Sequence, residues 1–234
     1  MTLLYICFLF GLIAGLLIGA AGIDIHTSIA ASVAAFFVSG LVGTVVYSQR
    51  GIIQWPDFVS VCVGAIPGAL FGAYVLPKIE SHFLTLFIAL VLILSAVRQF
   101  IYRDGSNPVN PTRNRPKYQL AFVGLVTGFL SVLSGTGGPL VLLPLLTWLS
   151  MPLITAIGLS QVIQLPISTF ATIGNVLNSL IDWELVLVLG FGVAFGSFLG
   201  AKGSEMLPIA HIKTLVAFLL FASGVYMVFL LLFG

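Results

Sequence analysis

Long apolar runs separated by short polar segments make up most of the chain. A helix needs about 20 apolar residues to cross a hydrocarbon core of about 30 Å, and runs of this length predict about eight spans. The predicted spans are Leu3–Gly22, Thr27–Ser48, Pro56–Pro77, Phe83–Tyr102, Gln119–Ser134, Thr155–Ser179, Glu184–Leu207 and His211–Phe233. The pattern therefore predicts an all-α, polytopic membrane protein surrounded by a lipid bilayer.

One apolar run is too short to cross a bilayer by itself. It extends from Pro139 to Ser150, and runs of about 10–14 apolar residues are typical of re-entrant or buried helices. We expect a half-helix at this position, directly after the span that ends at Ser134.

The composition agrees with a membrane protein. Hydrophobic residues make up 59% of the 234 positions and charged residues only 7%. A soluble domain carries about 25% charged residues, so this chain could not cover a surface that faces water. This excludes a soluble enzyme, a disordered chain and a disulfide scaffold, and the net charge of +2 indicates no nucleic-acid partner. Cys7 and Cys62 lie inside apolar runs and are interpreted as small hydrophobic residues.

The first apolar run has one feature of a secretory signal. Gly19, Ala20 and Ala21 resemble a small-residue cleavage site at the end of Met1–Leu17. However, no Lys or Arg precedes the run, and a signal peptide normally begins with a positive segment. We therefore expect a retained first span.

A polar segment divides the chain into two halves. Residues 103–118 contain Asn, Pro and several basic residues, and together with Arg98 they account for five of the nine Lys and Arg residues. Basic loops remain in the cytoplasm. We therefore predict a cytoplasmic linker at 103–118, cytoplasmic termini, a first repeat at 1–102 and a second at 119–234 in the cytoplasmic membrane.

The two halves resemble each other in sequence. A shift of 128 places Ile53-Gln54-Trp55 on Ile181-Asp182-Trp183, and the ladder Gly64, Gly68, Gly72 on Gly192, Gly196, Gly200. A shift of 113 places Gly11, Gly15 and Gly22 on Gly124, Gly128 and Gly135. Internal repeats are typical of secondary transporters, which bind substrate between the halves. With an even number of spans in each half, the repeats would run parallel.

Each glycine ladder presents one smooth helix face to a neighbouring helix. Glycines four residues apart let another backbone approach closely. The partner could be a helix of the same chain or of a second copy in a homodimer, and we favour a helix of the same chain.

A glycine-rich break follows the fifth span. Gly135, Thr136, Gly137 and Gly138 interrupt the helix, and Pro139 suits the first turn of a new one. A break at membrane depth is tolerated where it lines a cavity or is buried in protein. Free N–H groups at a helix start favour anions. We interpret the four residues, with Ser134, as an anion cradle; the alternative is a plain helix hairpin at the membrane edge.

A polar stripe marks the span after the half-helix. Its members recur every three or four residues, which places them on one helix face. They are Gln161, Gln164, Ser168, Thr172 and Asn175, with Ser160 at the start of the stripe. Pro166 is expected to kink this span and free a carbonyl. The stripe could line a substrate pathway, which we favour, or form hydrogen bonds between helices.

The span interiors lack ionisable residues. No Asp or Glu lies in the middle of a span, although cation carriers usually keep a buried carboxylate. His26, His82 and His211 stand singly near span ends, without ligand spacing. We expect no metal site and no cofactor. An intramembrane enzyme would need a nucleophile with a base, paired acids or metal ligands, and none is visible, so we expect no catalytic residue.

The order of these motifs resembles the TauE/SafE sulfite exporter family, also called the toluene-sulfonate-uptake-permease group. The matching segments are Gly135–Pro139, Leu143-Pro144, Ala156–Ser160, Asp182-Trp183 and Gly192–Ala201. The resemblance covers nearly the whole chain and is strongest in the second half. It implies a permease of the bacterial or archaeal cytoplasmic membrane that moves sulfite, sulfoacetate or related sulfur-containing anions.

The first half departs from this family pattern. Only five residues separate Gly22 from Ser28, so the first half has no room for a half-helix. We nevertheless interpret the chain as a permease that moves a small anion by alternating access. Its expected binding residues are Gly135, Thr136, Gly137, Gly138, Ser160, Gln161, Gln164, Ser168 and Thr172. The alternative is a membrane scaffold or subunit that transports nothing.

Overall fold

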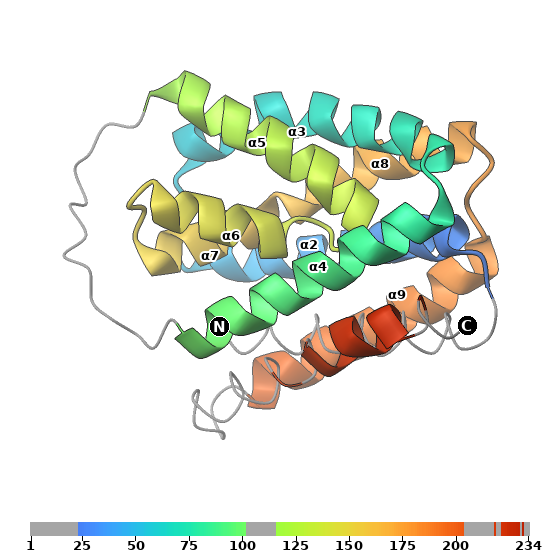
Figure 1. Cartoon of the computed structure of the whole chain (residues 1–234). Coiled ribbons are helices and arrows are strands. Elements are labelled where there is room, and N and C mark those ends of the chain that lie inside the picture. The colour runs from blue at the N-terminus through green and yellow to red at the C-terminus, as the bar shows by residue number, and fades with distance from the viewer. Residues whose placement is uncertain (1–22, 102–115, 204–217, 219–220, 230, 232–234) are drawn as a thin grey trace.

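A computed structural model describes residues 23–101, 116–203, 218, 221–229 and 231 of the chain. The predicted span Leu3–Gly22, nearly all of the linker at 103–118 and much of the span His211–Phe233 lie outside the described residues. Within the described residues every regular element is a helix, which confirms the all-α prediction (Figure 1).

The helix bounds lie close to the predicted spans. The elements are α2 (Ile25–Gln49), α3 (Trp55–Val75) with the short 3₁₀ turn η1 (Leu76–Lys78), α4 (Ser81–Ile101), α5 (Lys117–Ser134), α6 (Pro139–Trp148), α7 (Leu153–Val162), α8 (Gln164–Leu177) and α9 (Trp183–Gly203). Four described stretches are long and apolar enough to cross a membrane: Ile25–Gln49, Trp55–Lys78, Lys117–Ser134 and Ile154–Leu177. The chain is therefore a membrane protein.

The predicted span Thr155–Ser179 is divided into two helices. α7 ends at Val162 and α8 begins at Gln164. Pro166 has no N–H to donate to the carbonyl of Val162, four residues earlier, so the helical ladder is interrupted there. The chain continues through Ile163, whose N–H donates to the carbonyl of Leu159 at 3.0 Å.

The closest helix packing in the described structure joins α3 to α5. A Cβ added to Gly64 would overlap the carbonyl oxygen of Ala121, and one added to Gly68 would overlap that of Leu125. These glycines bring two backbones into direct contact. The first glycine ladder thus packs against a helix of the same chain, as expected, and provides no argument for a homodimer. On α9, Gly192 has no described atom within 4 Å, and the surroundings of Gly196 and Gly200 are not described.

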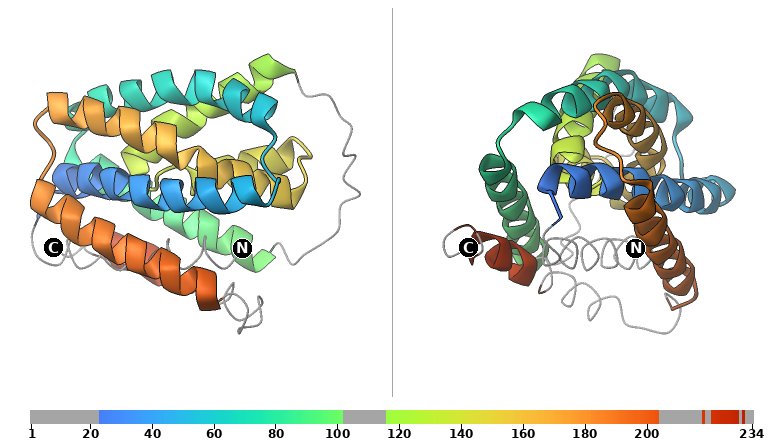
Figure 2. Two further views of the ribbon diagram at one scale, coloured as in Figure 1. Left: turned by 180° about the vertical axis from the view of Figure 1, so that it is seen from behind. Right: turned by 90° about the vertical axis from the view of Figure 1, so that its right-hand side faces the viewer.

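α2 runs through the middle of the bundle. It packs against α7 and α8 on one side and against the start of α9 through Ala31, Ala35 and Leu189. Figure 2 shows α4 and α9 on opposite sides of α2. At the end where α2 begins, the His26 ring nitrogen Nε2 lies 2.9 Å from the carbonyl oxygen of Ile79. This contact joins α2 to the turn between α3 and α4.

Helices that correspond under the shift of 128 run in opposite directions. Gly43 of α2 contacts Gln161, whereas Gly40 contacts Gln164, so α2 is antiparallel to α7 and α8. α9 starts at the end of the bundle where α3 ends, so α3 and α9 also run in opposite directions. Parallel repeats are therefore wrong for these pairs. The physical reason lies in α6, which turns back beside α5 towards the end where α5 begins, so the following helices reverse direction (Figure 1).

Candidate functional site

The break between α5 and α6 is built from left-handed backbone. Gly135 ends α5 with φ 66°, and the N–H of Thr136 donates to the carbonyl of Ser131 at 3.1 Å. Gly137 and Gly138 also have positive φ values, 68° and 126°, which side chains rarely allow. Pro139 then occupies the first turn of α6, as predicted.

The break lies inside the helix bundle. A Cβ on Gly137 would lie 2.8 Å from the Phe36 ring of α2, and a Cβ on Gly138 would lie 3.3 Å from both Ile163 and Ile167. A Cβ on Gly135 would lie 3.6 Å from the Cα atom of Ile29 on α2. The segment therefore fills the space between α2 and the junction of α7 and α8. A plain hairpin at the membrane edge does not fit this position.

Two hydroxyl groups lie together at the break. Ser134 Oγ is 2.9 Å from Thr136 Oγ1 and donates to the carbonyl of Leu130 at 2.8 Å. Both side chains are buried. Among the described residues, the backbone N–H groups of Gly137, Gly138 and Leu140 have no hydrogen-bond acceptor. Donors at a helix start favour negative charge.

The first part of the predicted polar stripe packs against glycines of α2. The Gln161 side chain contacts Gly43, and Gln164 contacts Gly40. Gln164 Nε2 donates to Gln161 Oε1 at 3.4 Å, so the two amides are neighbours. Ser160 donates to the carbonyl of Ala156 at 2.7 Å. These three side chains are buried at the junction of α7 and α8, next to the break.

The later part of the stripe reaches an apolar groove. This groove, about 530 Å³ in volume, lies between α2, α8 and α9. Ser168 and Thr172 line it together with exposed apolar side chains such as Phe37 and Phe191. The predicted residues therefore do not form one pocket, because Thr172 faces this groove while Gln161 and Gln164 face α2.

Several buried polar residues were not among the predicted binding residues. They are completely buried or nearly so, and a side-chain polar atom of each lacks a hydrogen-bond partner in the described structure. They are Ser39 on α2, Thr127 and Ser131 on α5, and Asn175 on α8. Asn175 belongs to the polar stripe, so its spacing was visible in the sequence. Thr127 and Ser131 are four residues apart and, with Ser134, follow the same helical spacing on α5, so this shorter stripe was also visible.

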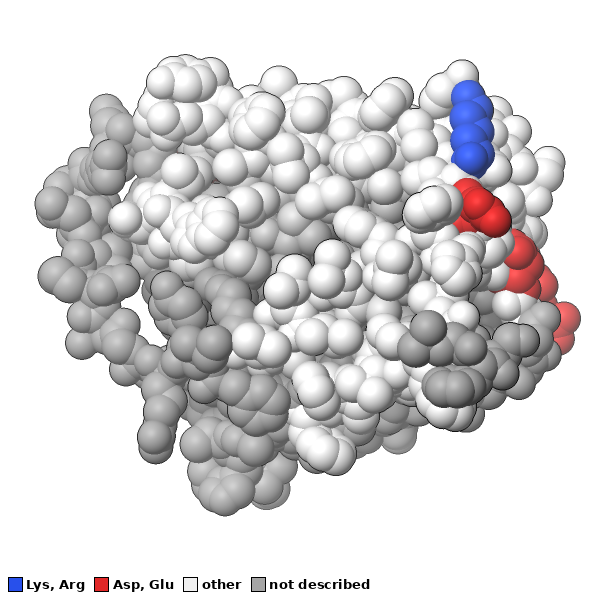
Figure 3. Space-filling model, in the orientation of Figure 1, with Lys and Arg blue, Asp and Glu red and all other residues white. Residues whose placement is uncertain are grey.

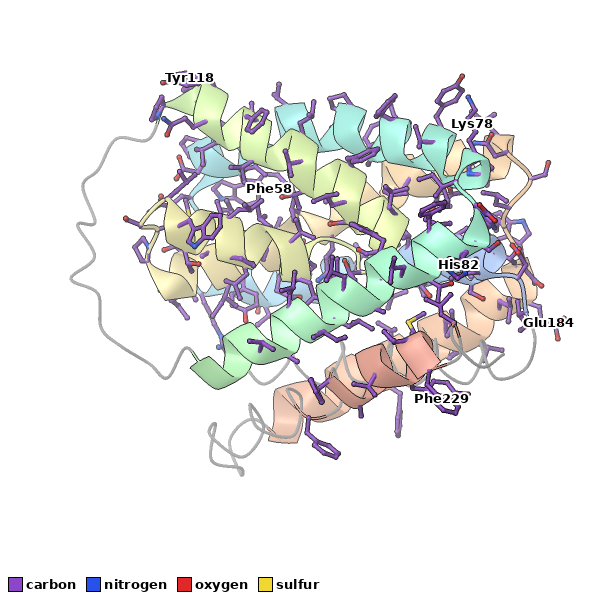
Figure 4. All side chains as sticks on the ribbon, viewed as in Figure 1. Phe58, Lys78, His82, Tyr118, Glu184 and Phe229 are labelled. Carbon is purple, nitrogen blue, oxygen red and sulfur yellow. The ribbon has the colours of Figure 1, made fainter. Side chains whose placement is uncertain are left out.

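The buried polar residues that the structure describes are uncharged. Charged side chains lie at the helix ends instead. Figure 4 shows Lys78, His82 and Glu184 at one end of the bundle and Tyr118 at the other, and Figure 3 shows basic and acidic groups together at the first of these ends. In the described ranges no three His, Cys, Asp or Glu side chains gather into a metal-binding group.

Comparisons with known proteins agree with the sequence resemblance. The family model for the sulfite exporter TauE/SafE matches residues 4–227. The chain is 26% identical to the probable membrane transporter protein YdhB of Bacillus subtilis, over 98% of this chain and 100% of the relative. It is 25% identical to the probable membrane transporter protein y4hK of Sinorhizobium fredii, over 78% of this chain and 75% of the relative.

A third relative is the probable membrane transporter protein YunE of Bacillus subtilis, 22% identical over 87% of this chain and 81% of the relative. No solved structure matches the chain significantly. The family match extends over nearly the whole sequence, including the buried break and the helices around it. The chain therefore belongs to the TauE/SafE sulfite exporter family.

Proposed function

We propose that the protein is a permease that moves a small anion, such as sulfite, a sulfonate or another sulfur-containing organic anion, across the cytoplasmic membrane. The family and the named relatives support a membrane transporter. The single observation that carries the anion assignment is the buried break between α5 and α6. There, the N–H groups of Gly137, Gly138 and Leu140 have no acceptor among the described residues, next to the Ser134–Thr136 hydroxyl pair.

Neutral donors suit transport of an anion. An N–H or O–H group stabilises a negative oxygen, and the effect is strengthened where water is excluded. A fixed cation would hold the ion more tightly, and transport requires release as well as binding. The absence of buried charge among the described side chains is consistent with this mode of binding.

The helix bounds support two repeats and hence alternating access. Adding 128 to α2, Ile25–Gln49, gives residues 153–177, which are the outer bounds of α7 and α8. Adding 128 to α3, Trp55–Val75, gives 183–203, the bounds of α9. Inverted repeats that bind substrate at their interface exchange inward-open and outward-open states by rocking. We extend this to repeats at 1–102 and 119–234, joined by the linker at 103–118.

The charge distribution supports a cytoplasmic linker. Lys78 shares its end of the bundle with four acidic residues, Asp24, Glu80, Asp182 and Glu184. The opposite end, from which the linker leaves, carries Arg50, Lys117 and Asp57. The positive-inside rule places the more basic end in the cytoplasm.

Transport in proteoliposomes tests the proposal. The purified protein is expected to move sulfite, sulfate, thiosulfate or a simple sulfonate, and Thr136→Val and Gln164→Leu are expected to slow this flux while insertion stays normal. Thr85→Val is the matched control, because Thr85 is half-buried on α4, away from the break, and its hydroxyl donates to the carbonyl of Ser81 at 2.8 Å. Wild-type flux in both variants would contradict the site. No flux with any of these anions would favour the scaffold instead.

A further inference from the structure

Hydroxyl groups on the described helices follow a common pattern with a few exceptions. In an apolar environment a Ser or Thr side chain can donate to the carbonyl three or four residues earlier. The hydroxyls that do so here are those of Ser28, Ser32, Thr44, Ser60, Thr85, Ser95, Ser134, Thr147, Ser160 and Thr169. Ser39, Thr127, Ser131 and Ser168 are buried and have no partner in the described structure.

Asn175 is the clearest exception among the buried side chains. Its relative exposure is 0%, yet neither Oδ1 nor Nδ2 has a hydrogen-bond partner among the described residues. An amide taken out of water without a partner costs about 1–3 kcal/mol of stability. Such a group is expected where a ligand or water completes its bonding.

The α2–α8 register places this amide at the level of the break. Gly43 faces Gln161 at the end of α7 and Gly40 faces Gln164 at the start of α8, so each step along α2 corresponds to one step back along α7 and α8. Continued in the same register, Ser168 is level with Phe36 and Asn175 with Ile29. Phe36 and Ile29 are the α2 residues that Gly137 and Gly135 contact. Ser168 and Asn175 therefore lie level with the two ends of the break.

The unpartnered atoms include acceptors as well as donors. Gln164 uses Nε2 towards Gln161, and neither its carbonyl oxygen Oε1 nor Asn175 Oδ1 has a hydrogen-bond partner among the described residues. Ser168 Oγ and Asn175 Nδ2 are donors on the same face of α8. A simple anion such as an alkylsulfonate only accepts hydrogen bonds. Bound at Asn175, it would accept from Nδ2 and leave the amide oxygen Oδ1 unpaired, at a cost in free energy.

We propose that Asn175 and Ser168 bind the transported anion, and that this face of α8 selects monoanions that also carry a hydrogen-bond donor. Protonated oxyanions and hydroxyalkylsulfonates belong to this class. The proposal rests on the proposed transport function and deepens it, because it names the residues and the chemistry that choose among anions.

The first test measures stability with and without ligand. Asn175→Leu removes an amide that has no hydrogen-bond partner in the described part of the chain, so the ligand-free protein should unfold at the same or a higher temperature. The same variant should lose the stabilisation that 2-hydroxyethanesulfonate gives to the wild-type protein. Lower ligand-free stability together with an unchanged ligand effect would overturn the proposal, because the amide would then be structural.

The second test measures selectivity with a matched pair of substrates. 2-Hydroxyethanesulfonate and ethanesulfonate differ only by a hydroxyl group, and we expect the wild-type protein to prefer the former. Asn175→Leu and Ser168→Ala should raise the half-saturating concentration of the hydroxylated substrate about tenfold or more and reduce the preference. Ser60→Ala is the control, because the buried Ser60 hydroxyl already donates to the carbonyl of Pro56 at 2.9 Å.

The outcomes separate the two proposals. If the wild-type protein carries sulfur-containing anions without preference for the hydroxylated one, or if both variants keep that preference, the role of α8 is wrong and the transport function stands. If the wild-type protein carries no anion of any kind, the transport function itself fails.

Discussion

Replacing Gly64 with alanine should separate α3 from α5. A Cβ at this position would overlap the carbonyl oxygen of Ala121 and lie 2.7 Å from the backbone nitrogen of Leu125. Non-bonded carbon atoms normally approach to about 3.5–4.0 Å. The obstacle is backbone, so no change of rotamer can make room, and α5 must move away by more than about 1 Å.

The cost of this movement can be estimated. A gap of about 0.5–1 Å removes a quarter to a half of the dispersion energy of each contact that it opens, and overpacking typically costs about 1–3 kcal/mol. Because the added atom meets backbone on α5, we expect the upper end of this range. The higher helix propensity of alanine stabilises the folded protein by about 1 kcal/mol and offsets part of this loss. The net loss in the free energy of unfolding should therefore be about 2 kcal/mol.

Thermal unfolding of the purified protein measures this loss, which corresponds to a fall in Tm of about 4–8 °C for a chain of this size. Gly190→Ala on α9 is the matched control, because no described atom lies within 4 Å of a Cβ there. It should leave the Tm unchanged or raise it. If Gly64→Ala is as stable as the wild-type protein, the close approach of α3 and α5 is wrong.

Three further predictions concern other parts of the chain. Asp24→Ala should cost about 1 kcal/mol in unfolding experiments, because the Asp24 carboxylate caps α2 through two backbone N–H groups. Gly137→Ala should reduce both Tm and anion flux, since its φ is 68° and its Cβ would meet Phe36; unchanged flux would argue against the break as a binding element. A cysteine introduced at Asn107 should react with impermeant reagents only from the cytoplasmic side, and labelling from outside would reverse the predicted orientation.

Local features of the fold could be predicted well from the sequence. Apolar runs predicted α2, α3, α4 and α5 to within a few residues, because the length of a membrane-crossing helix is set by the thickness of the bilayer. The break at Gly135–Pro139 and the short α6 were also predicted, since consecutive glycines and a proline act on the backbone at their own positions. The kink was expected at Pro166, and the helix is divided at Ile163, less than one turn earlier.

The candidate site could be predicted only in part. Helical spacing placed Gln164, Ser168 and Thr172 in one stripe, but it could not tell which neighbour each would meet. The structure separates them, with Gln164 against Gly40 of α2 and Thr172 in the groove beside α9. The importance of Asn175 became apparent only from the lack of any described partner for its amide, because neighbours come from distant segments of the chain.

The sequence by itself determined which segments are helical, where α5 must end and which faces are smooth enough for close packing, because these properties depend on residues a few positions apart. Only the tertiary structure decided that the first glycine ladder meets α5, that the corresponding helices run in opposite directions and that the break is enclosed by α2, α7 and α8. These features depend on contacts between residues far apart in the sequence. Asn178 and Ala73, for example, are 105 positions apart, and no local pattern encodes their contact.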